Sequence, residues 1–114
     1  MVRFGNFEVE YNRNAPDKVS VRIETDDKGE VWLPKCDIAR AYGVFVQSVN
    51  AGLKSLAKTG DFDEYRDVRV EYFTYNGKDC SVDLYSLETI IALGFRMKGL
   101  KCEAFRKWAA RRQK

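Results

Sequence analysis

The segment at residues 35–58 constrains the fold most, because it predicts two short helices joined by a tight turn at Gly43. Ile38, Ala39 and Tyr42 would share one face of the first helix, since positions three and four apart lie on the same side. Glycine adopts the positive φ that a sharp turn between two helices requires. The spacing therefore predicts a helix-turn-helix.

The second predicted helix has one face for the core and one for solvent. Val44, Val49 and Leu53 are expected to close the core beneath it. The polar types on the other face hydrogen-bond bases or phosphates, and amide side chains pair with adenine. Gly52 counts against this helix, because glycine costs roughly 1 kcal/mol relative to alanine in a helix interior. An ordinary helical hairpin with a polar face is the alternative. We expect base contacts from Gln47, Ser48, Asn50 and Lys54.

Length and composition indicate one globular unit. The chain has 114 residues and a hydrophobic content of 45%, which suits one core better than two. We therefore treat residues 1–114 as a single domain. No run of about 18 apolar residues occurs, and the first residues contain no apolar core of a signal peptide. A soluble, cytoplasmic protein without a membrane segment is expected.

The residue types that most often carry catalysis are sparse. The chain contains no histidine, so it lacks the usual general base and the commonest zinc ligand. Its three cysteines are far apart and form no C-x-x-C pair. Asp61, Asp63 and Glu64 have the chemistry of a magnesium site, but beside Gly60 they are more typical of a solvated turn. We expect no enzyme, no metal and no cofactor.

Charge is distributed unevenly along the chain. Residues 1–95 carry 12 basic and 16 acidic side chains, a balance of −4, whereas residues 96–114 carry 8 basic and one acidic, a balance of +7. A basic block suits contacts with DNA phosphates, although it also suits a solvated helix face. We expect phosphate contacts from Lys35, Arg40, Lys58, Lys78, Arg106, Lys107, Arg111 and Arg112.

Alternating apolar and polar residues predict two β-hairpins, one before and one after the helix-turn-helix. The first would join residues 19–24 to residues 31–33. The second spans residues 68–85 and turns at Asn76-Gly77, a strong short-range hairpin signal. A hairpin directly after a helix-turn-helix is the arrangement of a winged helix. The alternative is that this hairpin only completes a small sheet with the first.

The two ends of the chain differ in how clearly they are patterned. Residues 86–113 predict C-terminal helices: Ser86 is a candidate N-cap for a helix that stops near Gly94, and a last amphipathic helix has an apolar stripe that includes Trp108. Residues 1–18 are expected to form a loose arm. The sequence thus predicts an α+β fold, a winged-helix-like helix-turn-helix with two β-hairpins and C-terminal helices.

Several motifs resemble those of a known family. The runs at residues 85–96 and 105–109 are similar to the YNLDxIIxVGYRV and FRxWA motifs of the RhuM family of bacterial virulence-associated proteins. Earlier stretches similar to the family's VWLTQ, MAELFGV and GELDE motifs lie, in the same order, at residues 31–33, 38–44 and 60–64. The resemblance covers about residues 19–112. It implies a DNA-binding protein of pathogenicity islands, prophages and other mobile elements, with no activity attached.

Two functions from different classes follow from these observations. The first is a transcriptional regulator that binds DNA in the major groove, as a homodimer on two half-sites. Phe95, Phe105 and Trp108 are candidates for the dimer interface, although such aromatic residues are also typical of a core. The second is a protein-protein interaction module, an antirepressor or adaptor of a mobile genetic element. The acidic excess of residues 1–95 favours this second function, since acidic surfaces repel DNA.

Overall fold

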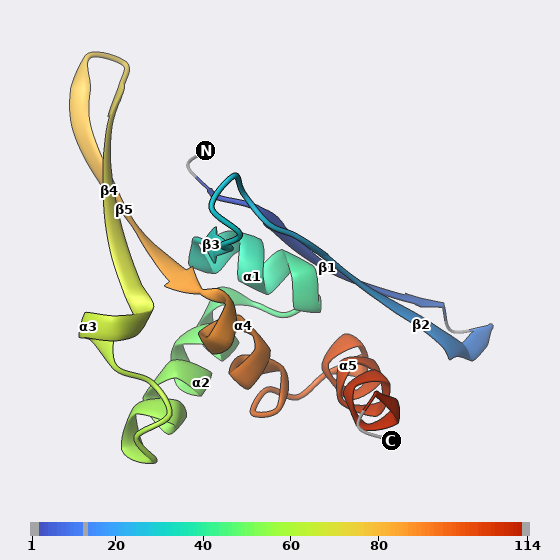
Figure 1. Cartoon of the computed structure of the whole chain (residues 1–114). Coiled ribbons are helices and arrows are strands. Elements are labelled where there is room, and N and C mark those ends of the chain that lie inside the picture. Colours follow the sequence, from blue (N-terminus) through green and yellow to red (C-terminus); the bar gives the residue numbers. More distant parts are fainter. Residues whose placement is uncertain (1–2, 13, 113–114) are drawn as a thin grey trace.

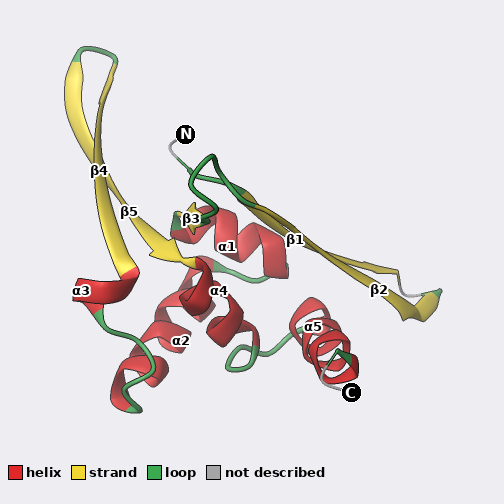
Figure 2. Cartoon of the chain, in the orientation of Figure 1, coloured by secondary structure: helices red, strands yellow, loops and turns green. Residues whose placement is uncertain are grey.

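A computed structural model describes residues 3–12 and 14–112 of the chain (Figure 1). The fold is mixed α+β, with helices packed against two small antiparallel sheets (Figure 2). Residues 113 and 114, part of the predicted basic end, lie outside the described residues. The elements in chain order are β1 (Asn6–Asn12), β2 (Ala15–Glu24), β3 (Trp32–Leu33), α1 (Lys35–Tyr42), α2 (Val46–Lys58), α3 (Glu64–Asp67), β4 (Val68–Tyr75), β5 (Lys78–Ser86), α4 (Leu87–Gly94) and α5 (Leu100–Arg111).

The predicted pair of helices and the turn between them are confirmed as α1 and α2. Gly43 ends α1 in the left-handed conformation with φ of 65°, and its N–H donates to the carbonyl of Arg40. This is the usual way in which a glycine satisfies the last carbonyls of a helix. Ile38, Tyr42 and Val49 are buried, as their spacing predicted.

Gly52 is required where it lies in α2. A Cβ at this position would approach Cδ2 of Leu93 to 2.7 Å and Cγ of Met97 to 3.4 Å. The missing side chain therefore lets α2 pack closely against α4 and the residues that follow it. The low helix propensity of glycine is the cost of this close approach.

The predicted second hairpin is confirmed as β4 and β5, with Tyr75 paired to Lys78 across the turn. Asn76 and Gly77 both have positive φ, of 51° and 75°, which matches the twist of a two-residue hairpin turn. The sheet has the order β3-β5-β4. In Figure 1 the turn of this hairpin projects away from all of the helices.

The prediction for the N-terminal part is wrong. Residues 6–12 are not a loose arm but form strand β1, which pairs with β2 through Phe7 and Ile23 among others. The predicted pairing of residues 19–24 with residues 31–33 is also wrong, because Trp32 in β3 pairs with β5 instead. The physical reason is burial: Phe7 and Val9 lie on one face of β1 and are buried against α1 and α5.

An aromatic cluster joins β1, α1 and α5. The ring centroids of Phe7, Tyr42 and Phe105 lie 5.4 to 5.9 Å apart. The Tyr42 hydroxyl donates to the carbonyl of Ile90 at 2.6 Å. Phe105 is thus a core residue. It is not available for the dimer interface, for which it was a candidate. Gly94 lies directly against this cluster, and a Cβ there would approach the Phe105 ring to 2.5 Å.

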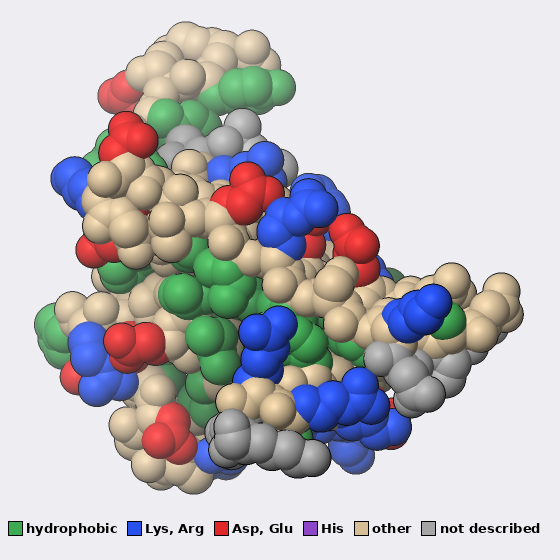
Figure 3. Space-filling view, turned by 45° about the vertical axis from the view of Figure 1, so that its right-hand side comes forward, with side chains coloured by type: hydrophobic (Ala, Val, Ile, Leu, Met, Phe, Trp, Pro, Cys, Tyr) green, Lys and Arg blue, Asp and Glu red, His purple; other side chains and the backbone are tan. Residues whose placement is uncertain are grey.

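Helices α4 and α5 occupy the predicted C-terminal segment. The Ser86 hydroxyl accepts a hydrogen bond from the N–H of Thr89 at 3.3 Å, which confirms the predicted N-cap of α4. Figure 3 shows Lys and Arg side chains gathered in the lower part of the view, where the C-terminal region comes forward. Within residues 3–12 and 14–112, no helix combines the length and apolarity needed to cross a membrane.

Candidate nucleic-acid interface

The outward face of α2 carries a stripe of exposed residues, each about one turn from the next. Gln47, Lys54 and Lys58 are exposed, and Ala51 lies between them. The opposite face is held by buried residues such as Leu56. Because Ala51 is short, the backbone of α2 can approach a partner closely at the centre of the stripe. We call Gln47, Ala51, Lys54 and Lys58 the α2 stripe.

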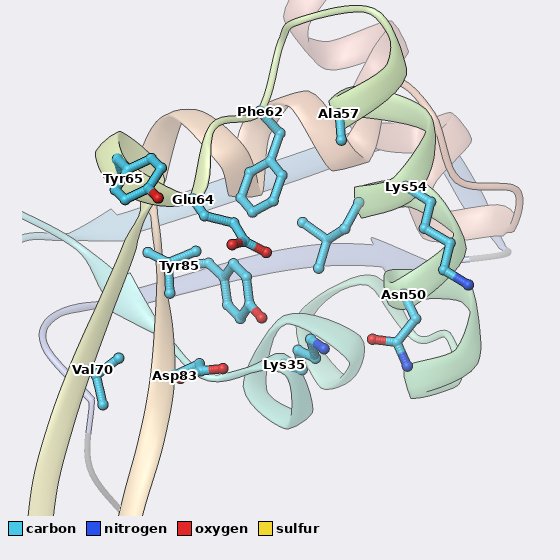
Figure 4. Close-up of a pocket in the computed structure, with 12 residues that line it drawn as sticks. Lys35, Asn50, Lys54, Ala57, Phe62, Glu64, Tyr65, Val70, Asp83 and Tyr85 are labelled. Atoms are coloured by element: carbon cyan, nitrogen blue, oxygen red, sulfur yellow. The ribbon is translucent and has the colours of Figure 1, made fainter.

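A groove runs along one flank of α2, between this helix and the base of the β4–β5 hairpin (Figure 4). It has a volume of about 710 Å³. Lys35 from α1 lies across the groove from Asn50, with its Nζ 5.8 Å from the ring centroid of Tyr85. Burial, together with the negative charges of Asp83 and Glu64, raises the pKa of Tyr85 to about 12. The groove therefore has an aromatic floor and a rim of mixed charge.

The four predicted base-contact residues do not lie on one face. Gln47 and Lys54 point outward, whereas Asn50 is half-buried on the groove wall and Ser48 is half-buried on the opposite flank. The Oδ1 atom of Asn50 is buried and has no hydrogen-bond partner within the described part of the chain. Successive helical residues are rotated by about 100°, so neighbours on the sequence cannot all share one direction.

The opposite flank of α2 is covered by the loop between α4 and α5. The guanidinium of Arg96 donates to Oγ of Ser55 at 3.0 Å, to Oγ1 of Thr59 at 3.1 Å and to a carboxylate oxygen of Asp61 at 3.2 Å. Arg96 was not among the predicted contact residues. Only its membership of the basic C-terminal block pointed to it, and no local pattern indicates that it packs beside α2.

The phosphate contacts predicted before the C-terminal block are widely separated. Lys58 lies on the α2 stripe and Lys35 in the groove, while Lys78 is at the tip of the β4–β5 hairpin. Arg40 pairs with Asp37 at 3.3 Å and borders a second cavity beside β1. The fold brings Lys35 and Lys58 close to α2 and leaves Arg40 and Lys78 at other places.

The predicted contacts on α5 have partners within the fold. Nη1 of Arg106 donates to the carbonyls of Gly94 and Met97, at 3.0 and 2.9 Å. Its guanidinium therefore holds the α4–α5 loop through Nη1, and a phosphate contact from Arg106 stays a prediction. Lys107 pairs with Glu103 at 3.6 Å. The guanidinium of Arg112 lies 4.8 Å from the Trp108 ring centroid, and Arg111 is exposed.

Asp67 connects α3 to the base of the β4–β5 hairpin. Its side chain is almost fully buried and accepts hydrogen bonds from Arg66 at 2.9 Å, from the N–H of Asp63 at 3.0 Å and from the Ser86 hydroxyl at 3.1 Å. Burial by itself would raise the pKa of Asp67, but these hydrogen bonds and the charge of Arg66 lower it below its ordinary value.

The acidic residues of the predicted turn have structural contacts. Asp63 accepts a hydrogen bond from the N–H of Tyr65 and so caps α3, and Asp61 binds Arg96. Glu64 lines the groove. In the described ranges, no group of three or more acidic or cysteine side chains has an arrangement that could hold a metal ion.

Comparisons with known proteins supply no relative for this chain. No family model matches the sequence, and neither a curated protein nor a solved structure is significantly similar to it. The candidate interface is therefore defined by its own geometry, and the RhuM resemblance stays a prediction from motifs.

Proposed function

We propose that this chain is a sequence-specific DNA-binding protein of the winged-helix type that places α2 in the major groove. The observation that carries the proposal is the α2 stripe, whose exposed amide and ammonium groups lie on the second of two short helices joined by a tight turn at Gly43. An α-helix fits the major groove, and such groups hydrogen-bond base edges and phosphates there.

The order of the elements supports the winged-helix part of the proposal. Helices α1 and α2 lie in sequence between β3 and β4, and the strands form a sheet in the order β3-β5-β4. The β4–β5 hairpin thus starts at the groove that also borders α2. In this proposal it is the wing, and the motif resemblance to the RhuM family points to the same function.

Each α2 residue has a distinct role in this proposal. Gln47 contacts a base through its amide, and Lys54 and Lys58 bind phosphates. Asn50 rotates from the groove wall toward DNA, where its Oδ1 gains a hydrogen bond that it lacks in the unbound chain. A buried polar atom without a partner costs roughly 1–3 kcal/mol, so this rotation would be favourable.

The test is binding to labelled duplexes, followed by fluorescence anisotropy at about 50 and about 200 mM salt, an interval over which phosphate contacts cost orders of magnitude in affinity. A random pool should yield an enriched sequence. Gln47→Ala should remove the preference for that sequence, and Lys54→Ala with Lys58→Ala should weaken binding to all duplexes. Lys28→Ala, which removes an exposed charge from the turn between β2 and β3, is the control. No binding at the lower salt concentration would refute the proposal.

A protein-protein interaction module is the second candidate function, and one observation favours it. The β4–β5 hairpin and α3 expose Tyr65 at 99%, Tyr72 at 80% and Tyr75 at 65% of their surface. Exposed tyrosines are enriched in protein interfaces. In this case the chain binds a second copy or another protein through the hairpin. Analytical ultracentrifugation tests this candidate. It is favoured if the wild-type chain sediments as a dimer, if the double variant Tyr72→Ser with Tyr75→Ser sediments as a monomer, and if neither of the two binds DNA.

A further inference from the structure

The two flanks of α2 have opposite charge. Residues 63–86, which include α3 and the β4–β5 hairpin, carry three basic and six acidic side chains, a balance of −3. Residues 96–112, the α4–α5 loop and α5, carry seven basic and one acidic, a balance of +6. DNA phosphates approaching α2 would therefore be repelled on the hairpin side and attracted on the loop side.

The α4–α5 loop is fixed against both the turn and α2. Met97 packs beside Gly52, and Gly99 lies next to Val44, whose Cγ1 would be 3.6 Å from a Cβ at Gly99. The aliphatic part of Lys101 crosses the turn, with its Cδ 3.4 Å from the place of a Cβ at Gly43. The loop and the start of α5 thus border the N-terminal half of α2.

Most basic side chains of this region are committed to partners. Arg96 binds Asp61, Arg106 binds backbone carbonyls, Lys107 binds Glu103 and Arg112 stacks on an indole ring. Lys98 and Lys101 make no ion pair with any residue that the structure describes, and Lys101 also borders the cavity beside β1 that Arg40 lines. Lys98 is exposed, and it lies between two residues that pack on α2 and on the turn.

We propose that Lys98 and Lys101 bind the DNA phosphates beside α2, and that the tip of the β4–β5 hairpin does not. The inference rests on the proposed DNA-binding function and names the side of α2 on which the backbone is held. Arg106 acts as a positioning residue, because its two hydrogen bonds close the loop that carries Lys98. Lys78 at the hairpin tip is adjacent to Asp79 and belongs to the acidic flank.

The experiment compares two double variants of the full chain with equal loss of charge. Lys98→Gln with Lys101→Gln removes both charges but keeps each side chain out to Cδ, the atom of Lys101 that lies nearest to the turn at Gly43. The matched control is Lys28→Gln with Lys78→Gln, which changes an exposed turn between β2 and β3 and the hairpin tip. The probe is a labelled random-sequence duplex, and the readout is the slope of log affinity against log salt.

Each phosphate contact contributes roughly 0.9 to this slope. The Lys98/Lys101 variant should flatten the slope by about two, so that its loss of affinity between about 50 and about 200 mM salt shrinks about tenfold. The control should keep the wild-type slope. Thermal unfolding of both double variants verifies that they fold. If the Lys98/Lys101 variant does not fold, Lys98→Gln alone takes its place, and it should flatten the slope by about one.

The outcomes separate this inference from the proposed function. Wild-type binding with an unchanged slope in the Lys98/Lys101 variant overturns the inference alone. A slope that flattens equally in the control also overturns it, since the effect would then come from net charge or from the hairpin. A wild-type chain that binds no duplex overturns the proposed function as well.

Discussion

The two β-hairpins of this chain have the same antiparallel form but differ in what covers them. In the β1–β2 hairpin, Phe7 and Val9 are buried beneath α1 and α5. In the β4–β5 hairpin, burial ends at Leu84 and Tyr85 near its base, and Tyr72 is exposed farther out. The β1–β2 hairpin, which helices cover on one face, is therefore part of the core. The outer part of the β4–β5 hairpin, which no helix covers, is available for contacts with other molecules.

The largest effect should come from the covered hairpin. Phe7→Ala removes a ring that packs against Tyr42 and Phe105, and it should lower the free energy of unfolding by about 3–5 kcal/mol. Urea unfolding followed by circular dichroism measures this change. Phe7→Leu, which keeps most of the apolar contact, should cost less. A loss below about 1 kcal/mol for Phe7→Ala would show that β1 is not a core strand.

The base of the projecting hairpin should come second. Asp67→Asn leaves the hydrogen bonds of Arg66 and Ser86 weakened and should cost about 1–3 kcal/mol at neutral pH. The folded-state pKa of Asp67 lies below its unfolded value, so the carboxylate stabilises the fold above an ordinary aspartate pKa of about 3.9. This stabilisation is lost as the pH falls through the folded-state pKa.

Unfolding curves across pH check the Asp67 prediction. Wild type and Asp67→Asn should differ most at neutral pH, and the difference should shrink as the pH falls below about 4 and through the lowered folded-state pKa. Asp63→Asn is a suitable comparison, because its side chain is exposed and caps only the short helix α3. A constant difference between wild type and Asp67→Asn at every pH would contradict the assigned protonation change.

A smaller and more local effect is expected at the hairpin turn. Gly77→Ala places a side chain at a φ of 75° and should cost about 1–2 kcal/mol. Amide hydrogen exchange should then accelerate in the part of β4 and β5 that lies between Leu84 and the turn. It should stay unchanged in β1 and β2. Gly77→Asn should be milder, since asparagine tolerates positive φ. Equal acceleration in both hairpins would mean that the projecting hairpin is tightly coupled to the core.

The smallest effect is expected for the exposed tyrosine of the projecting hairpin. Tyr72→Ser should change the free energy of unfolding by no more than about 0.5 kcal/mol, because the side chain is 80% exposed. Equilibrium urea unfolding measures it alongside Phe7→Ala. A larger loss would show that Tyr72 is covered, for example by a second copy of the chain, and dilution would then lower the stability further.

The elements that the sequence predicts well are those with a local signal. Gly43 marks the turn between α1 and α2, Asn76-Gly77 marks the hairpin turn, and Ser86 marks the start of α4. Each of these residues determines the backbone within a few positions of itself. The alternation in β1 is an equally local signal of a strand, since Phe7 and Val9 flank a glutamate, and it contradicts the expected loose arm.

The parts that could not be predicted depend on distant neighbours. Trp32 pairs with Ser86, and nothing near β3 in the sequence specifies that partner. For the same reason the sequence does not show that Asn50 turns into the groove or that Arg106 binds two carbonyls. A pattern along one element predicts which face is apolar, whereas the partners of a polar side chain are set by tertiary packing.

The close packing at Gly52 has a consequence for how the chain folds during synthesis. The space left by this glycine is filled by Leu93 and Met97, which are made some forty residues later. Until they emerge, α2 lacks the surface that α4 and the loop after it provide, although α1 already has β1 and α2 to pack against. The packing of α2 therefore waits for the C-terminal half of the chain, and the exposed apolar face of α2 is the part of the nascent chain most open to aggregation.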